Sequence, residues 1–500
     1  MTSINTNIGA LIAQNNMEKS MASMNKAMER LSSGLRINSA SDDAAGASIS
    51  SRMEAQVRGL SQAVRNSQDA QNLINTIEGA NIEVVTSLQR LRELAVQSSS
   101  DTLSALDRTF LKDEATALIA EIDRIGDTTA YNGTNVLDGT FTSKFFQVGH
   151  MKDENIEVSV SSVKTSAIGS FQLSGAGKAY VVTDGASDTA TTGLTVDGYL
   201  GAATAAVSAG DSAKDQAAAI NADTASTGVT ATAVTFAKLS AISVAEGVTF
   251  GMTSDNSTSQ TIAVTITDVD DLTILRDAFN SASGVTGVTA SFFEGDQSAL
   301  LLTHATGEDI AFTNVTFDTN STTMTLQALE ADGSTAADTT GAVAGDGAND
   351  FMVTGTVTAS SIAAFTIAAD GADDAGFFDT DATDSDTTET GGTATLTALS
   401  SIEIGTLTGS GTAIEIIDGA IDMVNDIRSD LGAVSNRLDK TINNLTNVME
   451  NTAASKSHIT DADFAAETSN LTKAQILSQA ATSMLAQANA SKQNLLALLQ

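Results

Sequence analysis

Three histidines, His150, His304 and His458, are the residues of this chain best suited to proton transfer or metal binding. No two of them stand at a helical or metal-binding spacing, and the chain has no cysteine, so disulfides and thiolate chemistry are excluded. No serine-hydrolase, phosphate-binding or dinucleotide-binding motif stands in a supporting context. We therefore expect no catalytic residue, no metal, no cofactor, and a protein that is not an enzyme.

An acidic run is the remaining candidate for cation binding. Its members are Asp379, Asp381, Asp384, Asp386 and Glu389. A calcium-binding EF-hand loop needs a glycine at its turn and a bidentate glutamate at a fixed spacing, and this run lacks both. We interpret it as a solvated loop.

The composition favours long helices and excludes several kinds of partner. Proline is absent, although average usage would supply about 25 residues, and proline breaks helices at a cost of about 3 kcal/mol. The formal net charge of −36 argues against nucleic acid and anionic membranes as partners. No stretch approaches the roughly 18 apolar residues of a membrane span. The polar start, MTSINTN, predicts that there is no cleaved signal peptide.

A regular apolar seam runs through the N-terminal part of the chain. Fourteen positions between 49 and 95 alternate spacings of four and three, and all but Gln56, Ser67 and Asn81 are apolar. The apolar members are Ile49, Met53, Leu60, Ala63, Ala70, Ile74, Ile77, Val84, Leu88, Leu91 and Ala95. This heptad pattern predicts a coiled-coil helix about 70 Å long.

A second seam lies near the other end of the chain, with Thr441 as its only break. Its members are Val424, Ile427, Leu431, Val434, Leu438, Leu445 and Val448. Two heptad seams far apart in sequence are natural coiled-coil partners. The alternative is two helices buried in an ordinary bundle, but average helices are only about 11 residues long.

The extreme ends carry more apolar surface than one partner helix can bury. Near the start, Met17, Met21, Met24, Met28, Leu31 and Leu35 are spaced by four and three. Just before Gln500 stand Leu495, Leu496, Leu498 and Leu499. Each leucine left exposed forgoes about 1.5–3 kcal/mol, so we infer contacts with neighbouring chains. A frayed apolar tail is the alternative.

Helix boundaries can be predicted from capping residues. Gly34 is expected to end the first helix. Ser39 with Asp42, Ser104 with Asp107, and Thr460 with Asp463 each fit a capping box with aspartate in place of glutamate.

The middle of the chain differs from its ends in charge and texture. Residues 141 to 412 hold 34 acidic and 7 basic residues, while the ends hold 27 and 18. The middle alternates like strands and turns, and it contains two GVTA tetrads, at 228–231 and 287–290, each preceded by a helical stretch. We expect two related small α+β modules in a solvated middle.

The predicted fold class is mainly α at the two ends, with long coiled-coil helices from the N- and C-terminal segments packed together. A central β-rich, α+β insertion of two or more small domains separates them. The expected segments are helices at 1–40 and 41–140, a hairpin-rich connection at 141–190, α+β modules at 191–250 and 251–325, a β-rich region at 326–411, and helices at 412–455 and 456–500.

Several blocks of the chain resemble bacterial flagellins. They are LSSGLRINSA at 31–40, DDAAG at 42–46, LQRLRELAVQ at 88–97, YNG at 131–133 and the run from Asp461 to Leu499. The resemblance covers about 140 residues at the front and about 90 at the back. The central repeats resemble the small IN modules of flagellins, with Ala219, Ile220 and Asn221 at the motif.

The resemblance implies a layout, a location and partners. The two ends would form inner and outer tubes of a helical homopolymer, the extracellular flagellar filament. The chain would be exported unfolded by the flagellar type III system, helped by an export chaperone at its C-terminal helices. Filament cap and hook-junction proteins would be further partners, and the ends would fold on assembly.

The resemblance also implies candidate site residues. Toll-like receptor 5 of hosts would read Gln89, Arg90, Leu94 and Glu114, although Leu94 can equally face the packed interior. Polymerisation and the coiled-coil core would use the apolar residues Ile4, Ile8, Leu11, Met21, Met24, Met28, Leu31, Ile74, Ile77, Val84, Leu88, Leu91, Val424, Ile427, Leu431, Val434, Leu438, Leu445, Phe464, Leu485, Leu495, Leu496, Leu498 and Leu499.

Two other functions fit parts of the sequence. A flagellin-like protein of the hook–filament junction would share similar ends, and long filaments formed unaided would argue against it. A surface adhesin would use the acidic middle, and a middle-deleted variant that swims but does not adhere would reveal that role.

Overall fold

The computed structural model describes residues 6–100, 102–182, 193–208, 210–256, 258–293, 295–318, 323–337, 342–344, 350–369, 378 and 391–497. It divides into two compact units. The first unit comprises residues 1–75, 143–158 and 432–500, and the second comprises 76–142 and 159–431. The predicted fold class is confirmed: long helices occupy both ends of the chain and a β-rich insertion lies between them.

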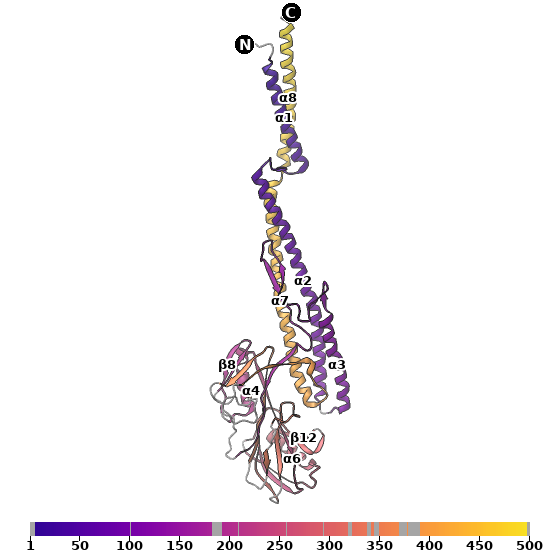
Figure 1. The fold of residues 1–500 in the computed structure, drawn as a ribbon, viewed down its shortest axis with the longest axis vertical. Helices are drawn as coiled ribbons and strands as arrows, with labels where there is room; N and C mark the ends of the chain where they lie inside the picture. Colours follow the sequence, from indigo (N-terminus) through magenta and orange to yellow (C-terminus); the bar gives the residue numbers. More distant parts are fainter. Residues whose placement is uncertain are drawn as a thin grey trace. The chain divides into compact units, whose positions relative to one another are not determined.

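Five long helices make up the two ends (Figure 1). They are α1 (Ile8–Ser33), α2 (Ala44–Ser98), α3 (Ala105–Thr128), α7 (Leu407–Thr460) and α8 (Phe464–Ala497). Helices α2 and α7 contain 55 and 54 residues, which corresponds to about 80 Å each. Such lengths agree with a chain that has no proline.

Two of the predicted helix boundaries are confirmed by cap geometry. Gly34 ends α1 in the left-handed conformation, with a φ of 73°, and its N–H donates to the Arg30 carbonyl. Ser104 and Asp107 form a reciprocal capping box at the start of α3.

The other two capping boxes were misplaced, because an aspartate further along does the capping. Asp42 accepts from the Ser39 N–H within a turn before the helix, while Asp43 accepts from the Gly46 N–H in the first turn of α2. Thr460 is the last residue of α7. Asp463 is the residue whose carboxylate accepts from the N–H groups that open α8.

In the first unit, two antiparallel helix pairs and a hairpin are present. Helix α1 pairs with α8: Arg30 bonds to Glu467 at 2.9 Å, and Asn7 reaches the Ala488 carbonyl at 3.2 Å. Residues 44–75 of α2 lie against 432–460 of α7, where Leu60 and Ala63 pack with Leu445. The hairpin consists of β3 (Lys144–Gln147) and β4 (Asn155–Val158).

In the second unit, α2 continues between α7 and α3. Arg92 pairs with Asp418 at 2.6 Å and Glu78 with Arg428 at 2.7 Å, so α2 and α7 are again antiparallel. A two-stranded hairpin of β1 (Ala130–Tyr131) and β2 (Thr134–Asn135) follows α3.

Three larger sheets form the central insertion in the second unit. The four-stranded sheet has the order β20 (Gly392–Thr393), β19 (Thr366–Ala369), β7 (Leu194–Gly198), β8 (Gly201–Ala205). The five-stranded sheet has the order β11 (Gln260–Thr265), β10 (Gly247–Thr253), β14 (Ile310–Phe317), β17 (Asp350–Val353), β6 (Ala179–Val182). The largest has the path β12 (Val288–Phe293), β13 (Asp296–His304), β9 (Thr230–Ser240), β18 (Thr356–Ser361), β5 (Gly169–Ser174), β21 (Thr395–Ala398), with β15 (Met324–Ala328) on β9 and β16 (Ala342–Ala344) on β15.

Strand β9 belongs to two hydrophobic cores. Its residues 230–234 pair with β18, and its residues 235–240 pair with β13 and β15. The first core packs α4 (Ala213–Ala222) on the β7, β9 and β18 strands. The second packs α6 (Thr273–Thr286) on β10, β12, β13 and β14, around the rings of Phe250, Phe279 and Phe312.

The two GVTA stretches share one atomic arrangement. Each follows a helix, begins with a left-handed glycine at a φ of 73°, and continues into a strand. In the first, the Asn221 side chain accepts from the Ala231 N–H and donates to its carbonyl, at 2.8 and 2.7 Å. Asn280 likewise accepts from the Ala290 N–H at 2.8 Å and donates to the Ala290 carbonyl at 2.9 Å. Each asparagine therefore clamps its helix to the strand that follows.

Candidate functional site

The α1–α8 pair buries small side chains and exposes large ones. Ala13, Ala27 and Ala474 are buried where the two helices meet. By contrast, Ile8 is 62% exposed and Ile476 is 61% exposed. The other exposed large apolar residues of this pair are Leu11, Ile12, Met21, Met28, Phe464, Leu477 and Met484. Large apolar side chains left exposed in such number are a feature of interaction surfaces.

The predicted polymerisation residues of the ends divide into exposed and half-buried groups. Ile8, Leu11, Met21, Met28 and Phe464 are exposed, whereas Met24, Leu31 and Leu485 are half-buried. Ile4, Leu498 and Leu499 lie outside the described residues, and so do the side chains of Leu495 and Leu496. The assignment of these residues to polymerisation stays a prediction.

Sequence reasoning missed Ile12, Ile476, Leu477 and Met484 as part of this surface. Leu477 and Met484 stand seven residues apart, but the residues between them at seam positions are alanines, and the prediction used only the leucines at the end of this helix. The signal that could have found them is the number of large apolar residues in α1 and α8. It exceeds what these helices need in order to pack against each other through alanine.

The α2–α7 pair has the opposite arrangement. Every seam position of α2 from 60 to 95 is buried, including Ser67 and Asn81. In α7, Val424, Leu431, Leu438 and Leu445 are buried, and Ile427 and Val434 are half-buried. Apart from the exposed Ile49 and Val448 and the half-buried Met53 and Gln56 at the far ends of the seams, these residues have their partners within the chain.

Asn81 is an unusual member of the α2 seam. It is fully buried, and neither its amide nitrogen nor its amide oxygen has a hydrogen-bond partner. An unpaired polar group of this kind costs about 1–3 kcal/mol. A single buried asparagine in a coiled coil fixes the register at the expense of stability.

Arg90 and Glu114 form an exposed ion pair between α2 and α3. The Arg90 Nη2 atom lies 2.8 Å from Glu114 Oε1, and Glu93 adds a second contact at 2.9 Å. Hydrogen bonds to Glu93 and Glu114 raise the pKa of Arg90 above its ordinary value. Gln89 is exposed beside them.

Leu94 is the exception among the four predicted receptor residues. Its side chain is 0% exposed. Because it stands four residues after Arg90, it lies on the face of α2 that is turned to α3. Leu94 therefore contributes to the packed interior beneath the exposed patch, and the structure does not bring it to the surface with the other three.

The described residues offer neither a membrane span nor a metal cluster. No helix in the described ranges is long and apolar enough to cross a bilayer. Nor do three or more histidine, aspartate or glutamate side chains gather there in a way that could hold an ion. The acidic run at 379–389 lies outside the described residues.

Three family models match the chain in order. A model of the bacterial flagellin N-terminal helical region matches residues 4–142, and one of the C-terminal helical region matches residues 414–499. A model of the flagellin hook IN motif matches residues 193–245, around the Asn221 clamp.

Whole-length relatives agree with these models. The chain is 37% identical to the B-type flagellin of Pseudomonas aeruginosa and 36% identical to the flagellin of Salmonella typhimurium, each over 99% of both chains. Among solved structures, FliC from Burkholderia pseudomallei matches 74% of this chain and 99% of its own, with 18% identity and a TM-score of 0.30.

Both the end regions and the full length of the chain thus point to one class of structural, filament-forming proteins. The chain belongs to the bacterial flagellin family. Members of this family are subunits of the flagellar filament and serve motility.

Proposed function

We propose that this chain polymerises through the open faces of α1 and α8, and that its role is structural and not enzymatic. The supporting observation is the exposure of large apolar side chains such as Ile8, Ile476 and Met484 on helices whose buried side chains, among those described, are Ala13, Ala27, Ala474 and Glu467. Neighbouring copies would cover these faces in an extracellular filament. The gain from burying each large side chain is about 1.5–3 kcal/mol.

Seeded growth of filaments from purified monomer tests this proposal. Ile476→Glu places a charge on the exposed apolar face, so we expect elongation to fail or slow severely while the monomer stays folded. Gln475→Glu is the matched control, because it adds the same charge to an exposed polar position of α8. Electron microscopy and sedimentation measure the outcome. Normal filaments from the Ile476→Glu variant would refute the proposal.

Export and assembly partners follow from the same surface. A chain with open apolar faces at both ends needs protection before assembly, and an export chaperone on the C-terminal helices would provide it. Export unfolded through the flagellar type III system, followed by addition beneath a cap and onto hook-junction proteins, fits this sequence of events. Co-purification of the chaperone with full-length chain, but not with one truncated before α8, is the expected result.

The exposed patch of Gln89, Arg90 and Glu114 supports a proposal of recognition by Toll-like receptor 5. In this proposal Leu94 acts indirectly, by holding α2 against α3 beneath the patch. Arg90→Ala is expected to weaken receptor signalling without loss of thermal stability, whereas Leu94→Ala would reduce both. A cell reporter assay with monomeric protein measures signalling. An Arg90→Ala protein that signals like the parent would refute this recognition.

Two alternatives remain separable from filament formation. A protein of the hook–filament junction would add to existing structures without growing, so the length of seeded filaments distinguishes it. An adhesive role for the acidic middle would survive as a separate activity, lost when the central insertion is deleted while swimming is retained.

A further inference from the structure

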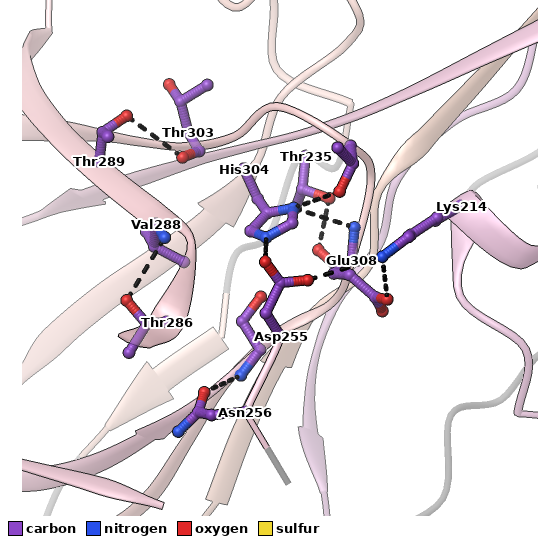
Figure 2. Close-up of polar contacts among 12 residues, drawn as sticks. Lys214, Thr235, Asp255, Asn256, Thr286, Val288, Thr289, Thr303, His304 and Glu308 are labelled. Atoms are coloured by element: carbon purple, nitrogen blue, oxygen red, sulfur yellow. Dashed lines mark hydrogen bonds and ion pairs between the residues drawn. The ribbon is translucent and has the colours of Figure 1, made fainter. Parts of the chain in front are cut away.

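The fork in β9, where this strand passes from one central core to the other, is held by polar side chains around His304 (Figure 2). Val234 pairs with Thr356 of β18, and the next residue, Thr235, pairs with His304 of β13. The loop at 305–309 leaves β13 at this point and leads into β14. It therefore sits where the two cores part.

The 305–309 loop is tied to the first core by three contacts. The Lys214 N–H, on α4, donates to the Gly307 carbonyl at 3.2 Å, and the Lys214 ammonium lies 2.9 Å from the Glu308 carboxylate. The Thr235 hydroxyl donates to the Glu308 carbonyl at 2.7 Å. Gly307 has a φ of 83°, and a Cβ there would lie 2.4 Å from that of Ala233. The loop thus fits closely against β9.

His304 holds the same loop from the second core. Its ring is 2% exposed. The Glu308 backbone N–H donates to Nδ1 at 3.2 Å, and the Thr306 hydroxyl lies 3.3 Å from the same atom. On the other side of the ring, Nε2 lies 3.2 Å from Asp255 Oδ2. An Nδ1 that accepts in this way belongs to a ring with its hydrogen on Nε2, on the side of the carboxylate, where Nε2 has no hydrogen-bond partner of good geometry.

This arrangement does not make a catalytic relay, although Asp255, His304 and Thr306 stand in the order of one. A relay needs a free Nδ1 lone pair to take the hydroxyl proton. Here the Glu308 N–H already occupies that lone pair. The ring therefore serves to hold the loop.

We propose that His304 is a proton-operated latch between the two central cores: the neutral ring holds the 305–309 loop in the fork, and a proton on Nδ1 releases it. With both ring nitrogens protonated, the Glu308 N–H faces a second donor and loses its acceptor. A buried N–H without a partner is unfavourable, so the loop must move. Histidine is the side chain that changes charge between about pH 5 and 8.

Some charged neighbours of the His304 ring favour its protonation and others oppose it. Asp255 and Glu308 attract an imidazolium, but Lys214 lies within 3.6 Å of the first and 2.9 Å of the second and opposes it. The neighbours from β9 and from the turn before β12, Thr235 and Gly287, do not titrate.

Asp309, in the same loop, supplies an opposing pH effect. Burial, followed by the nearby Glu308 charge and the more distant Asp215, raises the pKa of Asp309 to about 7. A raised pKa in an acid stabilises the fold at low pH, and this contribution is lost as the pH rises towards 7. Acidification therefore strengthens the loop through Asp309 and weakens it through His304, so the sign of the response identifies the group.

Amide hydrogen exchange of the full-length monomer between pH 8 and pH 5, corrected for intrinsic rates, tests the latch. We expect the Glu308 amide to open about tenfold or more at pH 5, the effect of losing one buried hydrogen bond. His304→Asn keeps an acceptor oxygen near the Nδ1 position but cannot titrate, so its Glu308 amide should no longer open at pH 5 and should show only the opposing effect of Asp309. His150→Asn, in the first unit, is the matched control and should behave like the parent.

Two results would overturn the latch. One is exchange at Glu308 in the parent that is flat or slower at pH 5; the other is an opening of the Glu308 amide at pH 5 that survives in His304→Asn. Nitrogen NMR of the unsubstituted protein provides a test that does not depend on a variant folding. The ring should carry hydrogen on Nε2 at pH 8, and its titration midpoint should coincide with loop opening; a different tautomer or midpoint would also reject the latch.

Discussion

The α2–α7 and α1–α8 pairs are both antiparallel pairs of long helices, but they differ in where their large apolar side chains lie. Helix α2 places Leu60, Leu88 and Leu91 in its seam, each at most 2% exposed. Helices α1 and α8 bury alanines, and their isoleucines are exposed together with Met21, Met28 and Met484, while Met17 and Met24 are half-buried. The first pair has its hydrophobic partners in the same chain, whereas the second keeps its largest apolar groups for something outside it. Under the proposed function, stability and assembly therefore fall to different helices.

The largest expected effect separates the two pairs directly. Leu88→Ala leaves a cavity in a closed seam, so we expect it to lower the free energy of unfolding of the monomer by about 2–5 kcal/mol. Ile476→Ala removes an exposed side chain and should change it by less than about 0.5 kcal/mol, while reducing filament growth. Urea unfolding followed by circular dichroism measures the first quantity and seeded elongation the second. Equal losses of monomer stability would erase the distinction.

The central cores, also closed within the chain, sharpen the comparison through the two repeats. Gln216 is 0% exposed and both its side-chain polar atoms lack partners. The matching position of the second repeat is Leu275, which is buried in the second core. Gln216→Leu should therefore raise the free energy of unfolding by about 1–3 kcal/mol, and Leu275→Gln, the reciprocal change, should lower it. Thermal unfolding measures both, and a destabilised Gln216→Leu protein would indicate a partner for the amide.

A substitution at Asn81 tests whether the α2–α7 seam is stabilised by apolar packing alone. Asn81→Leu replaces an unpaired amide with an apolar side chain, so we expect the unfolding midpoint in urea to rise, by up to about 2 kcal/mol in free energy. Ile82→Leu, at an exposed neighbouring position, is the control and should have little effect. A lower midpoint for Asn81→Leu would mean that the seam depends on the amide for its register.

The smallest effect concerns pH and the turn between α1 and α2. Lys26, at 2.8 Å, holds the pKa of Asp42 well below its ordinary value of 3.8. A depressed pKa stabilises the fold above the ordinary value and is lost as the pH falls below it. Asp42→Asn filaments should thus melt slightly earlier than the parent at pH 7, with the difference shrinking towards pH 3. Light scattering during heating measures this, and Glu83→Gln controls for the loss of an exposed carboxylate.

The fold class and the seams could be predicted because the spacing of apolar residues along the sequence directly gives the period of a helix. The seam positions between Leu60 and Ala95 follow one heptad pattern, and all of these seam positions are buried. Leu73 and Leu94 are also buried but lie off this seam, so the heptad pattern did not select them. The domain boundaries stay predictions.

The His304 cluster could not be predicted for a different reason. Lys214, Asp255 and Glu308 are far apart in sequence, and only the sheet register brings them to one histidine. In the same way, apolar and polar residues alternate similarly in both halves of β9. The sequence of residues 230–240 therefore does not indicate that the strand changes its pairing partner at Thr235. Two helix caps were predicted three or four residues too early, because Asp43 and Asp463 accept from the first N–H groups of α2 and α8 in place of Ser39 and Thr460.

A strand that serves two cores limits how this middle region can change in size. Removing the second repeat would leave residues 235–240 of β9 with bare backbone donors and acceptors along an exposed edge, which invites aggregation. Extra residues in the loops leave β9 untouched, and loop closure becomes only slightly less favourable as loops lengthen. The two repeats and the β9 strand that they share therefore form one structural unit. We expect changes in length to be tolerated in the connecting loops and not in this unit.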